Sequence, residues 1–188
     1  AFTVARAATL DAVERVREAV RIDLEEGGTR AEFGDRVEAA LGSGALADHE
    51  LDALYRTQTA RAAAAGQRAV LDDPMVQDEF PYLLWSATHD GRVEPDHLAM
   101  EKAGLNGTAV YRADDPIFNT HFPPIRWKCR CICIPLSVAD AAEYGCAEAR
   151  RWLETGEPPA QPEFVGDVPA QIPPGWVPVA RGGIGAAV

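Results

Sequence analysis

The chain has 188 residues, of which 47% are hydrophobic, and a formal net charge of -11. This length suits one domain with an added helical region or tail, and the apolar content suffices for a core. The acidic balance argues against a broad nucleic-acid-binding surface, although Arg126, Lys128 and Arg130 form a local basic cluster. No run approaches the ~18 apolar residues of a membrane span, so we expect no membrane partner. The first ten residues lack a charged region followed by a long apolar core, so we expect no signal peptide.

Apolar residues at three- and four-residue steps predict three helices in the N-terminal part of the chain. Their ranges are 10–26, 29–41 and 48–71. Thr29 and Glu32 have the spacing of a capping box, which favours a helix start at this point. The third helix is polar in its middle, from Arg56 to Arg61. This stretch faces either solvent, which we favour, or a shared polar cleft.

The segment from residue 81 to residue 136 predicts short strands joined by turns. Runs rich in aromatic, apolar and threonine side chains indicate strands at 81–88, 108–112 and 129–136. Pro95 begins a short helix between the first two strands, and Ser137 caps a last helix with a break near Gly145. We therefore predict an α+β fold in which N-terminal helices pack on a small, mostly antiparallel sheet.

From residue 155 onward the chain is rich in proline and glycine. Such sequence cannot form a core by itself and is typical of an extended C-terminal tail. Its scattered Phe164, Ile172 and Trp176 are suited to docking on a neighbouring surface. We accordingly divide the chain into an N-terminal helical region (1–73), a small α+β core (74–154) and a Pro/Gly-rich tail (155–188).

Cys129, Cys131 and Cys133 alternate along the third predicted strand, which places their sulfurs on one face. Thiolates and imidazoles are common zinc ligands, so His97, His121, Cys129 and Cys131 are candidates for a zinc site. The Cys-x-Cys spacing differs from the usual zinc spacing, and two alternatives stay open. The cysteines are small buried core residues, which we favour, or one of them is a catalytic thiol. Four cysteines are too few for a disulfide framework, which predicts a reducing compartment.

Asp90 and Arg92 lie in a predicted turn, where we expect them to form an ion pair that holds the turn. His97 follows on the next element, so an acid–base site of these three residues is the alternative. A second turn is predicted at Asp114-Asp115-Pro116, with aspartate side chains bonded to the backbone. We assign no catalytic residue and favour a protein that is not an enzyme.

Several motifs follow one another in a specific order. They are Arg56-Thr57-x-Thr59-Ala60-Arg61, Asp90-x-Arg92 with His97, Asp114-Asp115-Pro116, and His121-x-Pro123-Pro124-x-x-Trp127-x-Cys129-Arg130-Cys131. This combination, within residues 1–140, resembles the phage Mu F-like family of minor head, or head-morphogenesis, proteins. From the resemblance we take Arg56, Thr57, Thr59, Asp90, Arg92, His97, Cys129 and Cys131 as motif residues without an assigned role.

The resemblance implies a minor capsid protein of a tailed phage or prophage that acts in procapsid assembly near the portal. Its partners would be the portal protein and other capsid components. It would be found in the virion, and in the host cytoplasm during assembly. Two alternatives from other classes are a nuclease or transferase that uses His97 with Asp90 and Arg92, and a DNA-binding virion protein.

Overall fold

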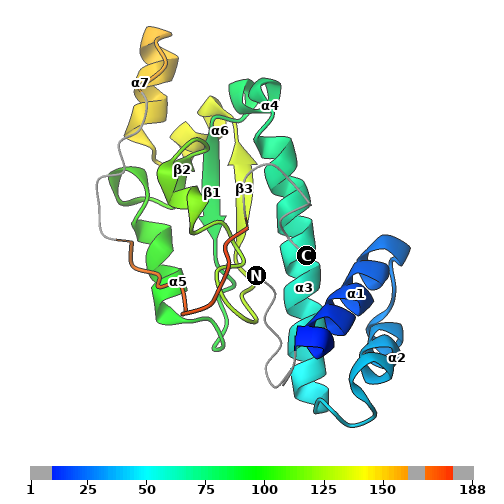
Figure 1. The fold of residues 1–188 in the computed structure, drawn as a ribbon. Coiled ribbons are helices and arrows are strands. Elements are labelled where there is room, and N and C mark those ends of the chain that lie inside the picture. The colour runs from blue at the N-terminus through cyan, green and yellow to red at the C-terminus, as the bar shows by residue number, and fades with distance from the viewer. Residues whose placement is uncertain (1–9, 161–167, 180–188) are drawn as a thin grey trace.

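Figure 1 shows the computed structural model of the chain, which describes residues 10–160 and 168–179. The N-terminal part consists of α1 (Leu10–Glu26), α2 (Arg30–Leu41) and α3 (Asp48–Leu71), at the predicted positions. The capping box at α2 is confirmed. The Thr29 side chain accepts a hydrogen bond from the Glu32 backbone N–H (3.3 Å), and the Glu32 carboxylate accepts one from the Thr29 N–H (2.7 Å).

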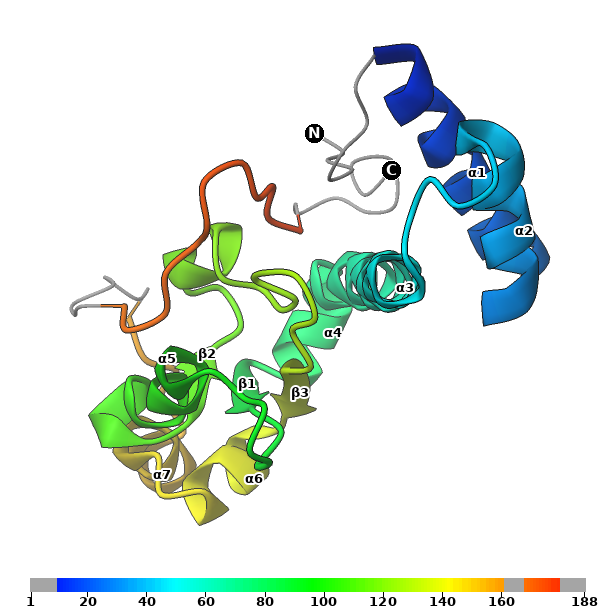
Figure 2. The same cartoon turned by 90° about the horizontal axis from the view of Figure 1, so that it is seen from below.

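Helices α1 and α2 lie beside the N-terminal half of α3 (Figures 1 and 2). Their apolar stripes meet in one buried cluster, because apolar residues at three- and four-residue steps share a helix face. Its buried members are Val16, Ala19, Val20, Phe33, Val37, Leu51 and Leu54. The C-terminal half of α3 belongs to a different cluster, which it shares with the sheet.

The sheet has three antiparallel strands in the order β2-β1-β3. Their bounds are β1 (Tyr82–Ser86), β2 (Val110–Arg112) and β3 (Ile132–Leu136). The central strand places Leu83 opposite Tyr111 of β2 and Trp85 opposite Cys133 of β3. The predicted α+β class, with helices before a small antiparallel sheet, is confirmed.

Both faces of the sheet are covered, because successive side chains of a strand point to opposite sides. Leu83 and Trp85 of β1 pack in the cluster that contains Ala64, Ala65 and Leu71 of α3. Tyr82 and Leu84 pack on the other side, in a cluster with residues of the last two helices. Each fully buried large side chain contributes about 1.5–3 kcal/mol relative to exposure. The edge strand β3 is also tied to α3, since Gln67 Nε2 donates a hydrogen bond to the Cys133 carbonyl (2.6 Å).

Short elements connect these layers. They are α4 (Pro74–Glu79), α5 (Pro95–Ala99), α6 (Val138–Glu143), α7 (Ala147–Thr155) and 3-10 turns at Met100–Lys102, Leu105–Gly107 and Pro116–Asn119. The predicted break of the last helix is present at Gly145, whose φ of 91° is a conformation that favours glycine. The predicted aspartate turn is present as well, with the Asp115 carboxylate accepting a hydrogen bond from the Ile117 N–H (2.8 Å).

Two expectations about local structure are corrected. The polar middle of α3 is only partly a solvated face, because Thr57, Gln58 and Arg61 are buried while Arg56 and Thr59 are exposed. The third strand begins at Ile132 rather than at residue 129, so Cys129 and Cys131 lie in the loop that precedes it. Pairing stops there because the partner strand β1 ends at Ser86, which lies opposite Ile132. The predicted alternation still extends into the loop, since Cys129, Cys131 and Cys133 are all buried while Arg130 and Ile132 are exposed.

The C-terminal segment 168–179 lies on the chain itself and crosses from α5 toward α3 (Figure 2). Ala170 and Val179 are buried in the main cluster, and Ile172 packs against it. Trp176 packs edge-on against Trp127, with ring centroids 6.1 Å apart. Phe164, the third residue predicted to dock, lies outside the described residues. Within the described ranges, none of the helices is long and apolar enough to cross a membrane.

Candidate metal centre

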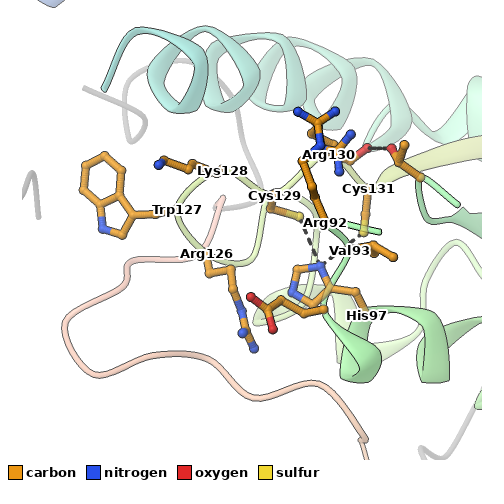
Figure 3. Close-up of a pocket in the computed structure, with 11 residues that line it drawn as sticks. Arg92, Val93, His97, Arg126, Trp127, Lys128, Cys129, Arg130 and Cys131 are labelled. Carbon is orange, nitrogen blue, oxygen red and sulfur yellow. Dashed lines mark hydrogen bonds between the residues drawn. The ribbon is translucent and has the colours of Figure 1, made fainter. Parts of the chain in front are cut away.

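Three buried side chains converge at the end of the sheet next to α5. His97 comes from α5, and Cys129 and Cys131 come from the loop before β3. The Nδ1 atom of His97 lies 3.3 Å from the Cys131 sulfur and 3.6 Å from the Cys129 sulfur (Figure 3). The donor atoms of all three residues lie within 4.8 Å of one another. This is the arrangement of a potential metal-binding group.

The backbone of His97 is fixed by the start of α5 and by the central strand. Pro95 occupies the first turn of the helix, where a missing N–H costs nothing. The His97 N–H donates a hydrogen bond to the Glu94 carbonyl (3.0 Å), and Trp85 Nε1 of β1 donates one to the His97 carbonyl (3.1 Å). These bonds fix the backbone from which the imidazole extends, and the imidazole Nε2 atom is buried without a hydrogen-bond partner among the described residues.

The cysteine loop is held by α3. Lys128, immediately before Cys129, has a φ of 60°, a left-handed conformation that is uncommon for residues other than glycine. Its backbone N–H donates a hydrogen bond to the Thr57 hydroxyl (3.2 Å), and the Cys129 N–H donates one to the Arg126 carbonyl (3.2 Å). Thr57, a motif residue from the sequence, thus orients the turn that presents Cys129.

Asp90 binds two arginines. Its carboxylate accepts two hydrogen bonds from Arg130 (both 2.7 Å) and pairs with Arg92 (3.0 Å). The predicted ion pair of the turn is confirmed, and Arg130 is an additional partner. Because Arg130 lies between Cys129 and Cys131, this contact ties the 90–92 turn to the cysteine loop. The Asp90 carboxylate is hydrogen-bonded to these two arginines, while His97 Nδ1 faces the two sulfurs.

Asp90 should make the stability of the chain sensitive to acid. The hydrogen bond from Arg130 is the largest cause that lowers the pKa of this carboxyl group. An aspartate in an unfolded chain has a pKa of about 3.9. The stabilisation by the ionised Asp90 carboxylate is therefore complete above that pH and is lost as the pH falls below it. We expect Asp90→Asn to be less stable than the wild type at pH 7, with a difference that shrinks from pH 4 to pH 2. Urea unfolding across this range measures it, with exposed Asp78→Asn as control. A difference that does not change with pH would contradict this role.

The two thiols near His97 are electrostatically unequal. The hydrogen bond from Cys131 is the largest cause that lowers the pKa of the Cys129 thiol. The same contact with Cys129, followed by burial, raises the pKa of Cys131. The contact therefore favours the thiolate form of Cys129 and the neutral thiol form of Cys131.

His121, the remaining predicted donor, lies elsewhere, and so does the third cysteine of the run, Cys133. Cys133 is 1% exposed, packs in the main core, and has its pKa raised by burial. His121 binds the C-terminal segment: its Nε2 donates a hydrogen bond to the Ala170 carbonyl (3.1 Å), and its Nδ1 lies 2.7 Å from the Thr120 hydroxyl. Burial is the main cause that lowers the pKa of His121. The structure thus brings together His97, Cys129 and Cys131 and places His121 apart from them.

A pocket of about 170 Å³ adjoins the three residues. Four basic residues contribute to its wall, namely Arg92, Arg126, Lys128 and Arg130. Arg92 and Arg130 are paired with Asp90, and Arg126 is paired with Asp96. A larger groove of about 990 Å³ runs between α3 and the cysteine loop. Arg56 and Thr59, the exposed motif residues of α3, line this groove together with Lys128, Arg130 and Ile132.

Sequence reasoning missed the residues that attach the C-terminal segment. Arg61, buried in α3, donates a hydrogen bond to the Val177 carbonyl (2.7 Å) and stacks on Trp176 at 4.9 Å. Asp96 accepts a hydrogen bond from the Gln171 N–H (3.3 Å). These partners are more than 70 residues apart in sequence. The polar middle of α3 was the available signal for Arg61, because a charged residue on a buried helix face needs a partner.

The comparisons with known proteins confirm the family resemblance. A family model described as Phage Mu protein F like protein matches residues 14–134, more than half of the chain. The chain is 32% identical, over 77% of its length, to the putative capsid assembly protein F of Escherichia phage Mu. It is also 32% identical, over 70% of its length, to the Mu-like prophage FluMu F protein of Haemophilus influenzae.

The chain spans only about a third of the length of these two relatives, 36% and 33% respectively. Among solved structures there is no match. The residues that the family model matches contain α2, α3, β1, β2 and the cysteine loop. The chain therefore belongs to the phage Mu protein F like family.

Proposed function

We propose that this chain is part of a minor head protein of a tailed phage or prophage, which acts in procapsid assembly near the portal through protein contacts. The observation that carries the proposal is the 32% identity, over 77% of the chain, with a protein named putative capsid assembly protein F. The protein would accordingly be present in the virion, and in the host cytoplasm while heads assemble.

The structural roles of the motif residues support a function through contacts with other proteins. Asp90 ties two arginines together, and Thr57 orients the cysteine loop. These contacts fix the shape of the surface between α3 and the loop. Arg56 and Thr59 differ from them, because both are exposed and both line the large groove. Exposed motif residues on a concave surface are candidates for recognition of a partner.

We assign the groove to the portal protein. Its walls combine alanine side chains of α3 with Lys128, with Arg56, which pairs with the lining residue Asp52, and with Arg130, which pairs with Asp90. Ile132 at its side is 54% exposed. A segment with apolar and acidic side chains would complement this surface. The proposed contact does not require the chain as a whole to be basic, because the positive charges are local to the groove.

Co-expression with the portal protein of the same genome tests this assignment. We expect the two proteins to co-purify and Arg56→Glu to reduce the recovered complex at least tenfold. Arg15→Glu is the matched control, because Arg15 is an exposed helical arginine that pairs with Asp11 four residues earlier, as Arg56 pairs with Asp52. An equal effect of the two substitutions would contradict the groove assignment. Failure of the unmodified chain to bind the portal protein would contradict the portal contact itself.

A further inference from the structure

The group of His97, Cys129 and Cys131 has the composition of a metal site. Two sulfurs and one imidazole nitrogen are donors that zinc prefers. All three residues are buried, at 2%, 8% and 5% exposure respectively. They come from two separate segments, so their convergence results from the fold rather than from their proximity in sequence.

The distances are those of ligands around one ion. Zinc–sulfur bonds of about 2.3 Å and zinc–nitrogen bonds of about 2.0–2.1 Å in a tetrahedral site place sulfur and nitrogen ligands roughly 3.6 Å apart. Here His97 Nδ1 lies 3.3 Å from Cys131 Sγ and 3.6 Å from Cys129 Sγ. In Figure 3 the same imidazole nitrogen faces both sulfurs. Coordination would therefore need only small side-chain adjustments.

The charges are also compatible with burial. Two thiolates neutralise a divalent cation, which avoids the high cost of an uncompensated buried charge. The nearby Arg92 and Arg130 are already paired with Asp90, and Arg126 is paired with Asp96. Three of the four basic residues that line the pocket are thus paired with carboxylates, and the fourth, Lys128, is exposed to solvent.

We infer that His97, Cys129 and Cys131 bind one zinc ion and leave its fourth coordination position open to the adjoining pocket. His97, Cys129 and Cys131 all line this pocket of about 170 Å³, which has room for a water molecule or one donor group of a ligand. His121 does not supply the fourth donor, since its two nitrogens face Thr120 and Ala170. The ion would join α5 to the cysteine loop. This inference does not depend on the proposed role in head assembly.

Native mass spectrometry under reducing conditions, after addition of one equivalent of zinc, tests the stoichiometry. We expect one zinc ion per 188-residue chain. Cys129→Ser, Cys131→Ser and His97→Asn should each lose it. Cys133→Ala and His121→Asn are matched controls, because they change a neighbouring cysteine and a nearby histidine outside the group, and both should retain zinc. Zinc retained by the first three variants, or lost from both controls, would overturn the assignment.

The absorption spectrum of cobalt(II), added in place of zinc, is a second test. It uses the unmodified chain and so does not depend on whether any variant folds. In the unmodified chain we expect the absorption of a tetrahedral ion with thiolate ligands, and its displacement by one equivalent of zinc. An octahedral spectrum without thiolate bands, or no binding, would overturn the inference. This readout concerns metal binding alone, so a negative result would not affect the outcome of the portal experiment.

Discussion

Replacing Trp85 with alanine is expected to destabilise the chain by about 3–5 kcal/mol, the usual cost of truncating a large buried aromatic side chain. Trp85 is 1% exposed and lies in the central strand, opposite Cys133. Its ring belongs to the largest buried cluster, and its Nε1 donates a hydrogen bond to the His97 carbonyl. The substitution therefore removes core packing and a support of His97 together. Urea unfolding followed by circular dichroism measures the loss.

Trp85→Phe separates the two contributions. Phenylalanine keeps much of the apolar packing but leaves the His97 carbonyl without its donor, at a cost of about 1–3 kcal/mol for a buried group. We expect this variant to fold and to bind zinc more weakly than the unmodified chain. A Trp85→Phe variant with unchanged zinc affinity would show that the strand does not position His97. A Trp85→Ala variant as stable as the wild type would contradict the assignment of Trp85 to the core.

Replacing Arg61 with alanine is expected to loosen segment 168–179 around Trp176 and Val177 and to cost about 2–3 kcal/mol. This magnitude combines a buried hydrogen bond from a charged donor with a stacked cation. Arg61 donates to the Val177 carbonyl (2.7 Å) and lies over the Trp176 ring (4.9 Å). Hydrogen exchange of the backbone amides in 168–179 should become much faster, and the free energy of unfolding should fall.

Arg56→Ala is the control for this prediction, because Arg56 is an exposed arginine on the same helix and its loss should change stability by less than about 0.5 kcal/mol. A double-mutant cycle with Trp176→Ala isolates the contact. Since the two side chains touch, we expect a coupling of about 1 kcal/mol. Additive effects of the two substitutions, or unchanged exchange in 168–179, would contradict the docking of this segment.

The sequence was most informative where structure is local. Helix ranges follow from apolar spacing and from caps such as Thr29, and the break at Gly145 follows from the conformational freedom of glycine. The alternation of Cys129, Cys131 and Cys133 correctly indicated buried positions. The family was also recognisable, because its motifs occur in a fixed order along the chain.

Contacts between distant segments could not be predicted in this way. Nothing near Arg61 in the sequence indicates Val177 or Trp176, and nothing near Thr57 indicates Lys128. The choice between two histidines illustrates the same limit. His97 and His121 are equal donors by residue type, but only the fold shows which imidazole faces the sulfurs and which binds Ala170. Tertiary packing decides such questions, since local sequence carries little information about it.

The central claim is that three motif residues, His97, Cys129 and Cys131, bind one zinc ion. Anomalous diffraction at the zinc edge, from crystals of the zinc-loaded chain, tests it most directly. We predict a single peak about 2.3 Å from the sulfurs of Cys129 and Cys131 and about 2.1 Å from His97 Nδ1. A zinc-loaded crystal with no peak between these three atoms, or with zinc bound only elsewhere, would contradict the claim.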